Sequence, residues 1–241
     1  MDKETNDLIE EFVLDGNDYR DWSISYSIAP TDTIPIVRER RDKETGEVTR
    51  TVEPAVWDFH PAFMKDSKRP NFNARVETLA TNGLWKRAFA GSRCLVPMRG
   101  YYEWTERDGL KIPHFLHGGD DLLAAAGIFA VRKVAVPGAD EQWQVSAAIV
   151  TREARDASGT VHDRMPLFLD RDEYDSWLNP APLDDAGSNG AGAAEMLAHV
   201  IAVSDRIAGS VQEYEVDRRV NNSRTADPAD AGLIAPVAAA D

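Results

Sequence analysis

The stretch CLVPMRGYYEWTERDG, residues 94–109, predicts a β-strand on which the rest of the fold depends. An apolar and aromatic run begins at Leu95, and a polar turn sequence at residues 105–109 ends it. Comparable runs follow along the chain. We therefore expect strands at 93–105, 112–117, 121–132 and 142–151.

One glutamate, Glu103, interrupts this run between Tyr102 and Trp104. Neighbouring side chains of a strand point to opposite faces. Glu103 therefore shares a face with Tyr101, whereas Tyr102 and Trp104 share the other face. A carboxylate between large rings lies either at a solvated edge or in a partly desolvated site that raises its pKa.

Helices and further strands are expected on both sides of this region. Residues 22–40 predict a loop that runs into a strand, residues 41–48 a hairpin turn, and residues 50–59 the partner strand. Helical patterns lie at 2–15, at 73–91 ending at Gly91, and at 171–180 ending at Pro180. Because these elements are interspersed without a regular βαβ alternation, the predicted class is α+β with mainly antiparallel sheet.

We expect a single domain over residues 1–241. The Gly-, Ala- and Ser-rich residues 184–195 predict a flexible linker or insertion. Residues 198–207 and 214–222 are expected to be further strands or loops, and the small, apolar tail from about residue 227 is expected to be frayed.

The composition indicates an acidic, soluble protein. The formal net charge is −14, and the bases are 20 arginines but only 7 lysines, a balance that resembles the proteins of salt-loving microbes. No apolar run approaches the 18 or so residues of a membrane span. The single cysteine, Cys94, excludes an intrachain disulfide and a multi-cysteine zinc site. We expect a cytoplasmic monomer, and the acidic charge by itself disfavours a nucleic-acid partner unless a local basic groove exists.

Four short motifs change that expectation. They are YSIAPT (26–31), NARVET (73–78), RGYYEW (99–104) and HDRMPL (162–167). In this order and spacing they resemble the SRAP family (SOS response-associated peptidase), whose members sense abasic sites in single-stranded DNA. VWDFHPAF (56–63) and VNNSRTADP (220–228) agree with the resemblance, which covers roughly residues 20–225. It implies an antiparallel, β-rich curved sheet or barrel with peripheral helices.

The resemblance also implies roles for particular residues. The family's active-site asparagine, glutamate and histidine match Asn73, Glu103 and His162. The arginines that hold DNA phosphates match Arg75 and Arg164, and the residues that line the DNA-binding cleft match Pro30 and Trp104. The implied protein acts in the DNA damage response, binds abasic single-stranded DNA, associates with the nucleoid on damage and uses neither metal nor cofactor.

The family's nucleophile is a cysteine directly after the initiator methionine, in a start that reads Met-Cys-Gly-Arg. The family's peptidase name refers mainly to self-removal of that methionine, which leaves an amine and a thiol that condense with the abasic-site aldehyde to a thiazolidine. Residue 2 is Asp in this chain, and no Met-Cys-Gly-Arg occurs. We expect the native product to carry the missing initial strand; the alternative is a degenerate member without its nucleophile. Cys94, which opens an apolar strand, is expected to be a buried core residue.

The residue chemistry supports these roles independently. An aldehyde forms a Schiff base with an amine, and proton transfers accompany this step. Glu103 is suited to shuttle a proton or hold the amine, and His162 to act as a general acid with an unperturbed pKa of about 6.5. Asn73, expected at a helix start, is either an N-cap, a hydrogen-bond partner of the substrate, or both. Arg75 and Arg164 either hold phosphates or form ordinary surface salt bridges.

Two other functional classes remain open from the sequence. One is a non-covalent binder of single-stranded DNA, and the other is a small-substrate hydrolase that uses Glu103 and His162. A metal site built from His60, Glu103, His162 and Asp163 lacks any known ligand spacing.

Overall fold

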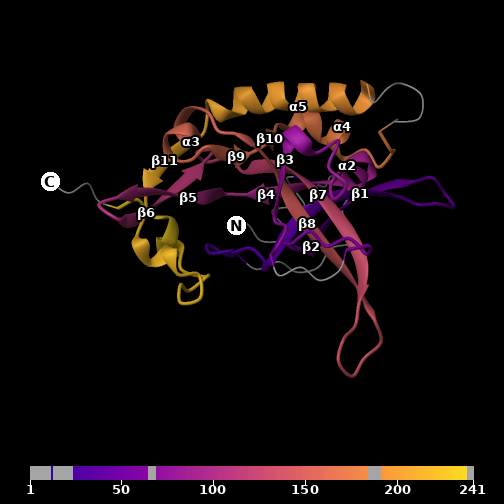
Figure 1. The fold of residues 1–241 in the computed structure, drawn as a ribbon, viewed down its shortest axis with the longest axis horizontal. Helices are drawn as coiled ribbons and strands as arrows, with labels where there is room; N and C mark the ends of the chain where they lie inside the picture. The colour runs from indigo at the N-terminus through magenta and orange to yellow at the C-terminus, as the bar shows by residue number, and fades with distance from the viewer. Residues whose placement is uncertain (1–11, 13–23, 65–68, 184–190, 238–241) are drawn as a thin grey trace.

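The computed structural model describes residues 12, 24–64, 69–183 and 191–237. Five strands close into a barrel (Figure 1), namely β1 (Thr33–Arg41), β2 (Val48–Val56), β4 (Arg93–Met98), β7 (Leu123–Val134) and β8 (Gln142–Glu153). The pairings run β1–β2, β2–β8, β8–β7, β7–β4 and β4–β1, so the last pairing closes the ring. The expected α+β class with a barrel and peripheral helices is confirmed.

The predicted hairpin near the start of the described chain is present. β1 and β2 pair in antiparallel register, with Val37 opposite Val52 and both side chains buried. In the turn, Asp42 accepts hydrogen bonds from the backbone N–H groups of Glu44 and Thr45. Gly46 adopts a φ of +75°, which glycine tolerates without strain.

The strand expected over 93–105 is divided between two sheets. β4 belongs to the barrel, whereas β5 (Gly100–Arg107) pairs with β6 (Leu110–His117), which pairs in turn with β11 (Gln212–Glu215). Gly100 marks the transition, because a Cβ there would lie 2.3 Å from the carbonyl oxygen of Leu116 and 2.5 Å from the Phe115 ring. Only glycine fits where the two backbones approach so closely. Figure 1 shows this three-stranded sheet at one end of the molecule.

The helix expected over 73–91 is wrong for most of its length. The segment forms β3 (Asn73–Arg75), the 3-10 turn η1 (Val76–Thr78) and only then α2 (Lys86–Gly91). β3 pairs in parallel with the end of β8, and its Ala74 is fully buried there. A non-local strand pairing therefore overrides the local helical pattern.

The segment expected as strand or loop at 198–207 is also wrong, because it lies inside the long helix α5 (Ala191–Ala208). Val200, Val203 and Ser204 are buried at helical spacing. The Ser204 hydroxyl oxygen accepts the backbone N–H of Phe168, in β10 (Phe168–Leu169), at 3.1 Å. Residues 191–195, expected as linker, are helical too, whereas residues 184–190 lie outside the described residues.

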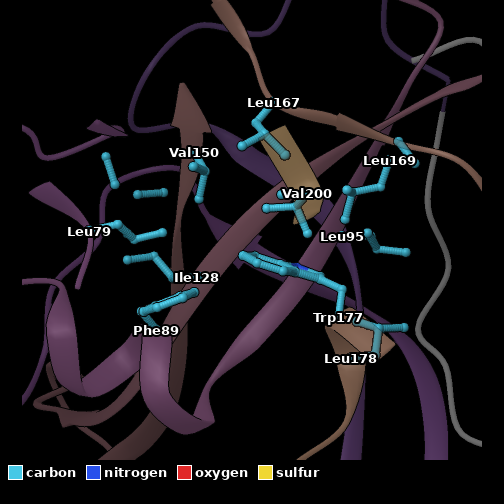
Figure 2. Packing of buried hydrophobic residues seen from close by; sticks show 14 of the residues in the cluster. Leu79, Phe89, Leu95, Ile128, Val150, Leu167, Leu169, Trp177, Leu178 and Val200 are labelled. Carbon is cyan, nitrogen blue, oxygen red and sulfur yellow. The ribbon is translucent and has the colours of Figure 1, made fainter. Parts of the chain in front are cut away.

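The core between the helices and the barrel centres on Trp177 (Figure 2). This residue belongs to α4 (Tyr174–Leu178), which follows η2 (Arg171–Glu173) and matches the short helix predicted before Pro180. The Trp177 ring is fully buried beside Leu95 and Phe89, and its Nε1 donates to the Cys94 carbonyl at 2.8 Å. The opposite faces of the barrel strands form a second apolar cluster that includes the fully buried Cys94.

The C-terminal segment packs against the three-stranded sheet. It contains η3 (Arg218–Asn221) and η4 (Ala231–Ile234), whose Leu233 is buried against Phe115. The backbone N–H of Val237 donates to the Glu215 carbonyl at 3.0 Å. The expected fraying from about residue 227 is therefore not found over residues 227–237. The helix expected at 2–15 lies outside the described residues except for Phe12, which is buried and stacks on Tyr174.

Candidate functional site

Glu103 and His162 lie together at the junction of the two sheets. Glu103 projects from β5, and His162 follows the last turn of α3 (Asp156–Val161). The Glu103 Oε1 and His162 Nδ1 atoms are 3.9 Å apart, and the two side chains are 25% and 42% exposed. Both groups are thus within reach of one substrate while Glu103 is largely desolvated.

Tyr101 ties α3 to the strand that carries Glu103. Tyr101 and Glu103 share a face of β5, and the Tyr101 hydroxyl hydrogen-bonds the hydroxyl of the buried Ser158 at 2.9 Å. The Ser158 carbonyl in turn accepts the backbone N–H of His162 at 3.0 Å. This chain of contacts fixes the position of His162 relative to Glu103.

Backbone and acidic groups surround Nδ1 of His162. The backbone N–H of Arg164 lies 3.0 Å from Nδ1 and can donate to it, and the Arg164 carbonyl oxygen lies 3.3 Å away and can accept from a protonated Nδ1. Nδ1 can therefore act as an acceptor or as a donor toward the Arg164 backbone. Protonation of Nδ1 would allow ion pairs with Glu103 and with Asp163, whose Oδ1 is 3.3 Å away.

The environment of Glu103 favours its neutral form. Burial raises the pKa of the Glu103 carboxyl above its ordinary value, and the nearby negative charge of Asp163 adds to this shift, whereas His162 opposes it. Of the two possibilities that the sequence left open for Glu103, the structure favours the partly desolvated site. A carboxyl with a raised pKa exchanges protons closer to neutral pH, as a proton shuttle requires.

Asn73 and Arg75 project from β3 at the end of β8. Asn73 pairs with Ile149 and Arg75 with Thr151, and both of these β3 side chains are exposed on either side of the buried Ala74. The expected helix start at Asn73 is wrong, because Asn73 occupies a strand, and the N-cap alternative is wrong with it. The parallel pairing with β8 holds its backbone instead.

Arg164 opens β9 (Arg164–Pro166), which pairs antiparallel with the end of β8. Its Nη2 donates at 2.8 Å to the carbonyl of Thr151, the β8 residue that pairs with Arg75. Its guanidinium also forms a two-pronged ion pair with Glu77, at 2.6 and 3.0 Å. The two predicted phosphate ligands therefore lie on the two strands that flank the end of β8, and Arg164 already has an acidic partner.

Pro30 is linked to the Asn73 region through Trp57. Its turn contains Thr31, whose φ of +81° is unusual for a non-glycine residue, and whose N–H donates to the Trp57 carbonyl. The Trp57 indole N–H donates in turn to the carbonyl of Phe72, the residue before Asn73, at 2.9 Å. The Pro30 turn is therefore fixed beside the start of β3.

Trp104 lies on the face of β5 opposite to Glu103. Its ring is 38% exposed, and its Nε1 donates to Asn221 Oδ1 in η3 at 2.7 Å. The alternation predicted from the sequence is thus observed. Any contact of Trp104 with DNA would therefore occur on the face of β5 opposite to the Glu103 carboxylate.

Cys94 does not contribute to the site. Its side chain is fully buried, and burial raises the pKa of the thiol, so that the thiolate is absent at neutral pH. This confirms the expected core role.

Two contributors were not predicted from the sequence. Glu77 and Ser158 act through contacts between segments distant in sequence, which no local pattern indicates. Apart from these contacts, Phe63, in the VWDFHPAF segment, is 60% exposed in the connection between β2 and β3. An exposed ring of this kind is a potential surface for base stacking.

Comparison with known families identifies the group to which this arrangement belongs. The family model described as SOS response associated peptidase (SRAP) matches residues 1–223. The chain belongs to the SRAP family. All four motifs recognised in the sequence lie inside the matched region, and they carry the residues of the site just described.

Several SRAP relatives are similar over much of their length. The chain is 26% identical to abasic site processing protein YoqW of Bacillus subtilis, over 93% of each chain. It is 25% identical to abasic site processing protein HMCES of Xenopus tropicalis, over 85% of this chain and 64% of that protein. A solved structure from Bordetella bronchiseptica superposes with a TM-score of 0.64 at 18% identity, over 90% of this chain and 97% of that one. This last likeness concerns the fold alone.

Within the described residues, no helix is both long enough and apolar enough to cross a membrane.

Proposed function

We propose that this protein binds abasic sites in single-stranded DNA and processes them with Glu103 and His162 as its proton-transfer groups. The observation that carries the proposal is the 3.9 Å pairing of a largely desolvated carboxyl with an imidazole, directly beside Arg164. Membership of the SRAP family and the names of its abasic-site-processing relatives support the same substrate.

The two groups suit the chemistry of an aldehyde. Attack of an amine on the abasic-site aldehyde gives a carbinolamine, which loses its hydroxyl as water when a proton is delivered to it. The imidazolium form of His162 can deliver that proton and return to neutral imidazole, and the carboxylate form of Glu103 can accept the proton of the amine and return it. This role requires both groups to reach the same carbon.

The covalent product is the finer part of the proposal. In a chain that begins Met-Cys-Gly-Arg, removal of methionine frees the amine and thiol of the cysteine. The amine condenses with the aldehyde and releases water, and the thiol then adds to the imine carbon to close a thiazolidine. The 241-residue sequence has no Met-Cys-Gly-Arg, so the covalent step is proposed for a chain that carries this start.

DNA binding is proposed to use the flanks of the β8 end. Arg75 and Arg164 hold phosphates, Asn73 bonds the sugar or the amine, and Pro30 lines the cleft. Trp104, on the face of β5 opposite to Glu103, and Phe63 offer exposed rings for unstacked bases. Single strands are preferred because the reacting sugar must leave the base stack.

A covalent bond would hold this acidic protein on DNA under conditions in which its phosphate contacts are weak. We propose that the protein works as a monomer in a salt-rich cytoplasm, on damaged nucleoid DNA. Each arginine–phosphate contact loses about 0.7 log units of affinity per decade of salt on single strands. A chain with a net charge of −14 therefore binds weakly at high salt, whereas a thiazolidine is insensitive to screening.

The test compares the 241-residue chain with one extended by Met-Cys-Gly-Arg and the initial strand that follows it, and with a matched extension that begins Met-Ala-Gly-Arg. Each is incubated with an abasic single-stranded oligonucleotide and analysed on a denaturing gel, with mass spectrometry to detect methionine removal. We expect an SDS-stable adduct only with the cysteine extension. Salt-sensitive binding without any adduct in all three chains would indicate a non-covalent binder, and the covalent part of the proposal would be wrong.

A further inference from the structure

The carboxylate of Glu77 is bound to the guanidinium group of Arg164. Nη1 of Arg164 lies 2.6 Å from Oε1 of Glu77, and Nη2 lies 3.0 Å from Oε2. This two-pronged arrangement is the one by which an arginine also binds a phosphate. The guanidinium that the proposed function assigns to DNA is thus already occupied by an anion of the same chain.

The electrostatics keep this internal anion charged. The hydrogen bonds from Arg164 lower the pKa of the Glu77 carboxyl, and the positive charges of Arg164 and Arg75 lower it further. Glu77 is therefore ionised at neutral pH. Its side chain is 49% exposed, so water and an incoming ligand reach the carboxylate. An ion pair this exposed is weak enough to be exchanged.

The backbone holds Arg164 independently of Glu77. Nη2 donates to the Thr151 carbonyl at 2.8 Å, a bond that does not involve the acid. The Thr151 bond therefore keeps the guanidinium against β8 when Glu77 leaves, and the Nη1 and Nη2 N–H groups that faced Glu77 become available to a phosphate.

We propose that Glu77 is an internal competitor which a DNA phosphate displaces from Arg164. The inference rests on the proposed function, because it names the group that regulates phosphate binding at that same site. In this exchange a DNA phosphate replaces the Glu77 carboxylate on the Arg164 guanidinium, while the bond from Arg164 to Thr151 is kept. The competitor lowers affinity for every single strand, so that lasting binding requires the further contacts at an abasic site.

The test titrates a labelled single-stranded oligonucleotide with a stable abasic-site analogue against four proteins. These are the wild type, Glu77→Gln, Arg164→Ala and the double variant. We expect Glu77→Gln to bind about two- to fivefold more tightly, because that factor corresponds to the free energy of the exposed ion pair that the phosphate no longer has to break. Its plot of log affinity against log salt should steepen by up to about 0.7, because the freed arginine gains one effective phosphate contact. In the Arg164→Ala background, Glu77→Gln should have no effect.

A matched control removes the same charge elsewhere. Glu44 is exposed in the β1–β2 turn, so Glu44→Gln changes the net charge equally without touching Arg164. Weaker binding and a flatter salt plot for Glu77→Gln would mean that Glu77 orients Arg164, and the inference would be wrong. An equal gain from Glu44→Gln, or a gain that persists without Arg164, would likewise overturn it. Failure of the wild type to bind single strands would instead refute the proposed function, which distinguishes the two failures.

Discussion

Replacing Tyr101 by phenylalanine removes the hydroxyl that ties α3 to β5. The lost interaction is a 2.9 Å hydrogen bond to Ser158, a residue that is only 1% exposed. A neutral hydrogen bond contributes about 1 kcal/mol net, and a buried partner left without one costs at least as much. We therefore expect Tyr101→Phe to lower Tm by about 2–4 °C for each kcal/mol lost in a chain of this size.

The same substitution should slow catalysis, because the bond positions His162. About 1 kcal/mol of orientation energy, if it is lost entirely in the transition state, corresponds to a roughly fivefold slower reaction. The assay is adduct formation with abasic DNA by the cysteine-extended chain, alongside thermal unfolding. The control is Tyr101→Phe combined with Ser158→Ala, in which no hydroxyl is left unpaired and much of the stability returns. A lowered Tm with an unchanged rate would refute the positioning role and leave Tyr101 a purely structural residue.

Substitutions at two further residues, Glu103 and Arg93, test the energetics of groups whose pKa burial shifts. Burial raises the pKa of Glu103 above 4.5, so the stability that its protonated form contributes is complete below that value and is lost as pH rises through the folded pKa. Tm profiles between about pH 4 and 8 should therefore show Glu103→Gln gaining stability relative to wild type as pH rises. Parallel profiles would contradict the raised pKa. Arg93, whose pKa burial lowers to about 10, donates to five backbone carbonyls at the ends of α2 and α4. Arg93→Met should cost about 3 kcal/mol or more, with a partial return in Arg93→Lys, and a loss below about 1 kcal/mol would show that water replaces these bonds.

Local patterns were sufficient for much of the sheet. The β1–β2 hairpin follows from two apolar runs around a polar turn with Gly46, and the strands from residue 93 onward from alternation and turns. Local patterns did not predict closure of the barrel, which only the family resemblance implied, because closure depends on the pairings of β4 with β1 and of β2 with β8. Those pairings join segments far apart in sequence, and no local signal fixes such partners.

The two wrong elements have different causes. Residues 73–75 belong to a stretch whose sequence pattern predicts a helix. Their backbone pairs with β8 instead, so tertiary contacts decide their conformation. In α5, the apolar residues Val200 and Val203 do lie at helical spacing, and the flanking Gly- and Ala-rich segment obscured this pattern. For the site, motifs predicted the pair Glu103 and His162, whereas Glu77 became visible only through its contact with Arg164.

The central claim is that the flanks of the β8 end bind abasic single-stranded DNA. The most direct measurement is a titration of the 241-residue chain with three labelled oligonucleotides of equal length: an abasic single strand, an undamaged single strand and an undamaged duplex. We predict the tightest binding to the abasic single strand, the weakest to the duplex, and weaker binding to both single strands when Arg75 and Arg164 are both replaced by alanine. Equal affinity for all three, unaffected by the two replacements, would contradict this claim.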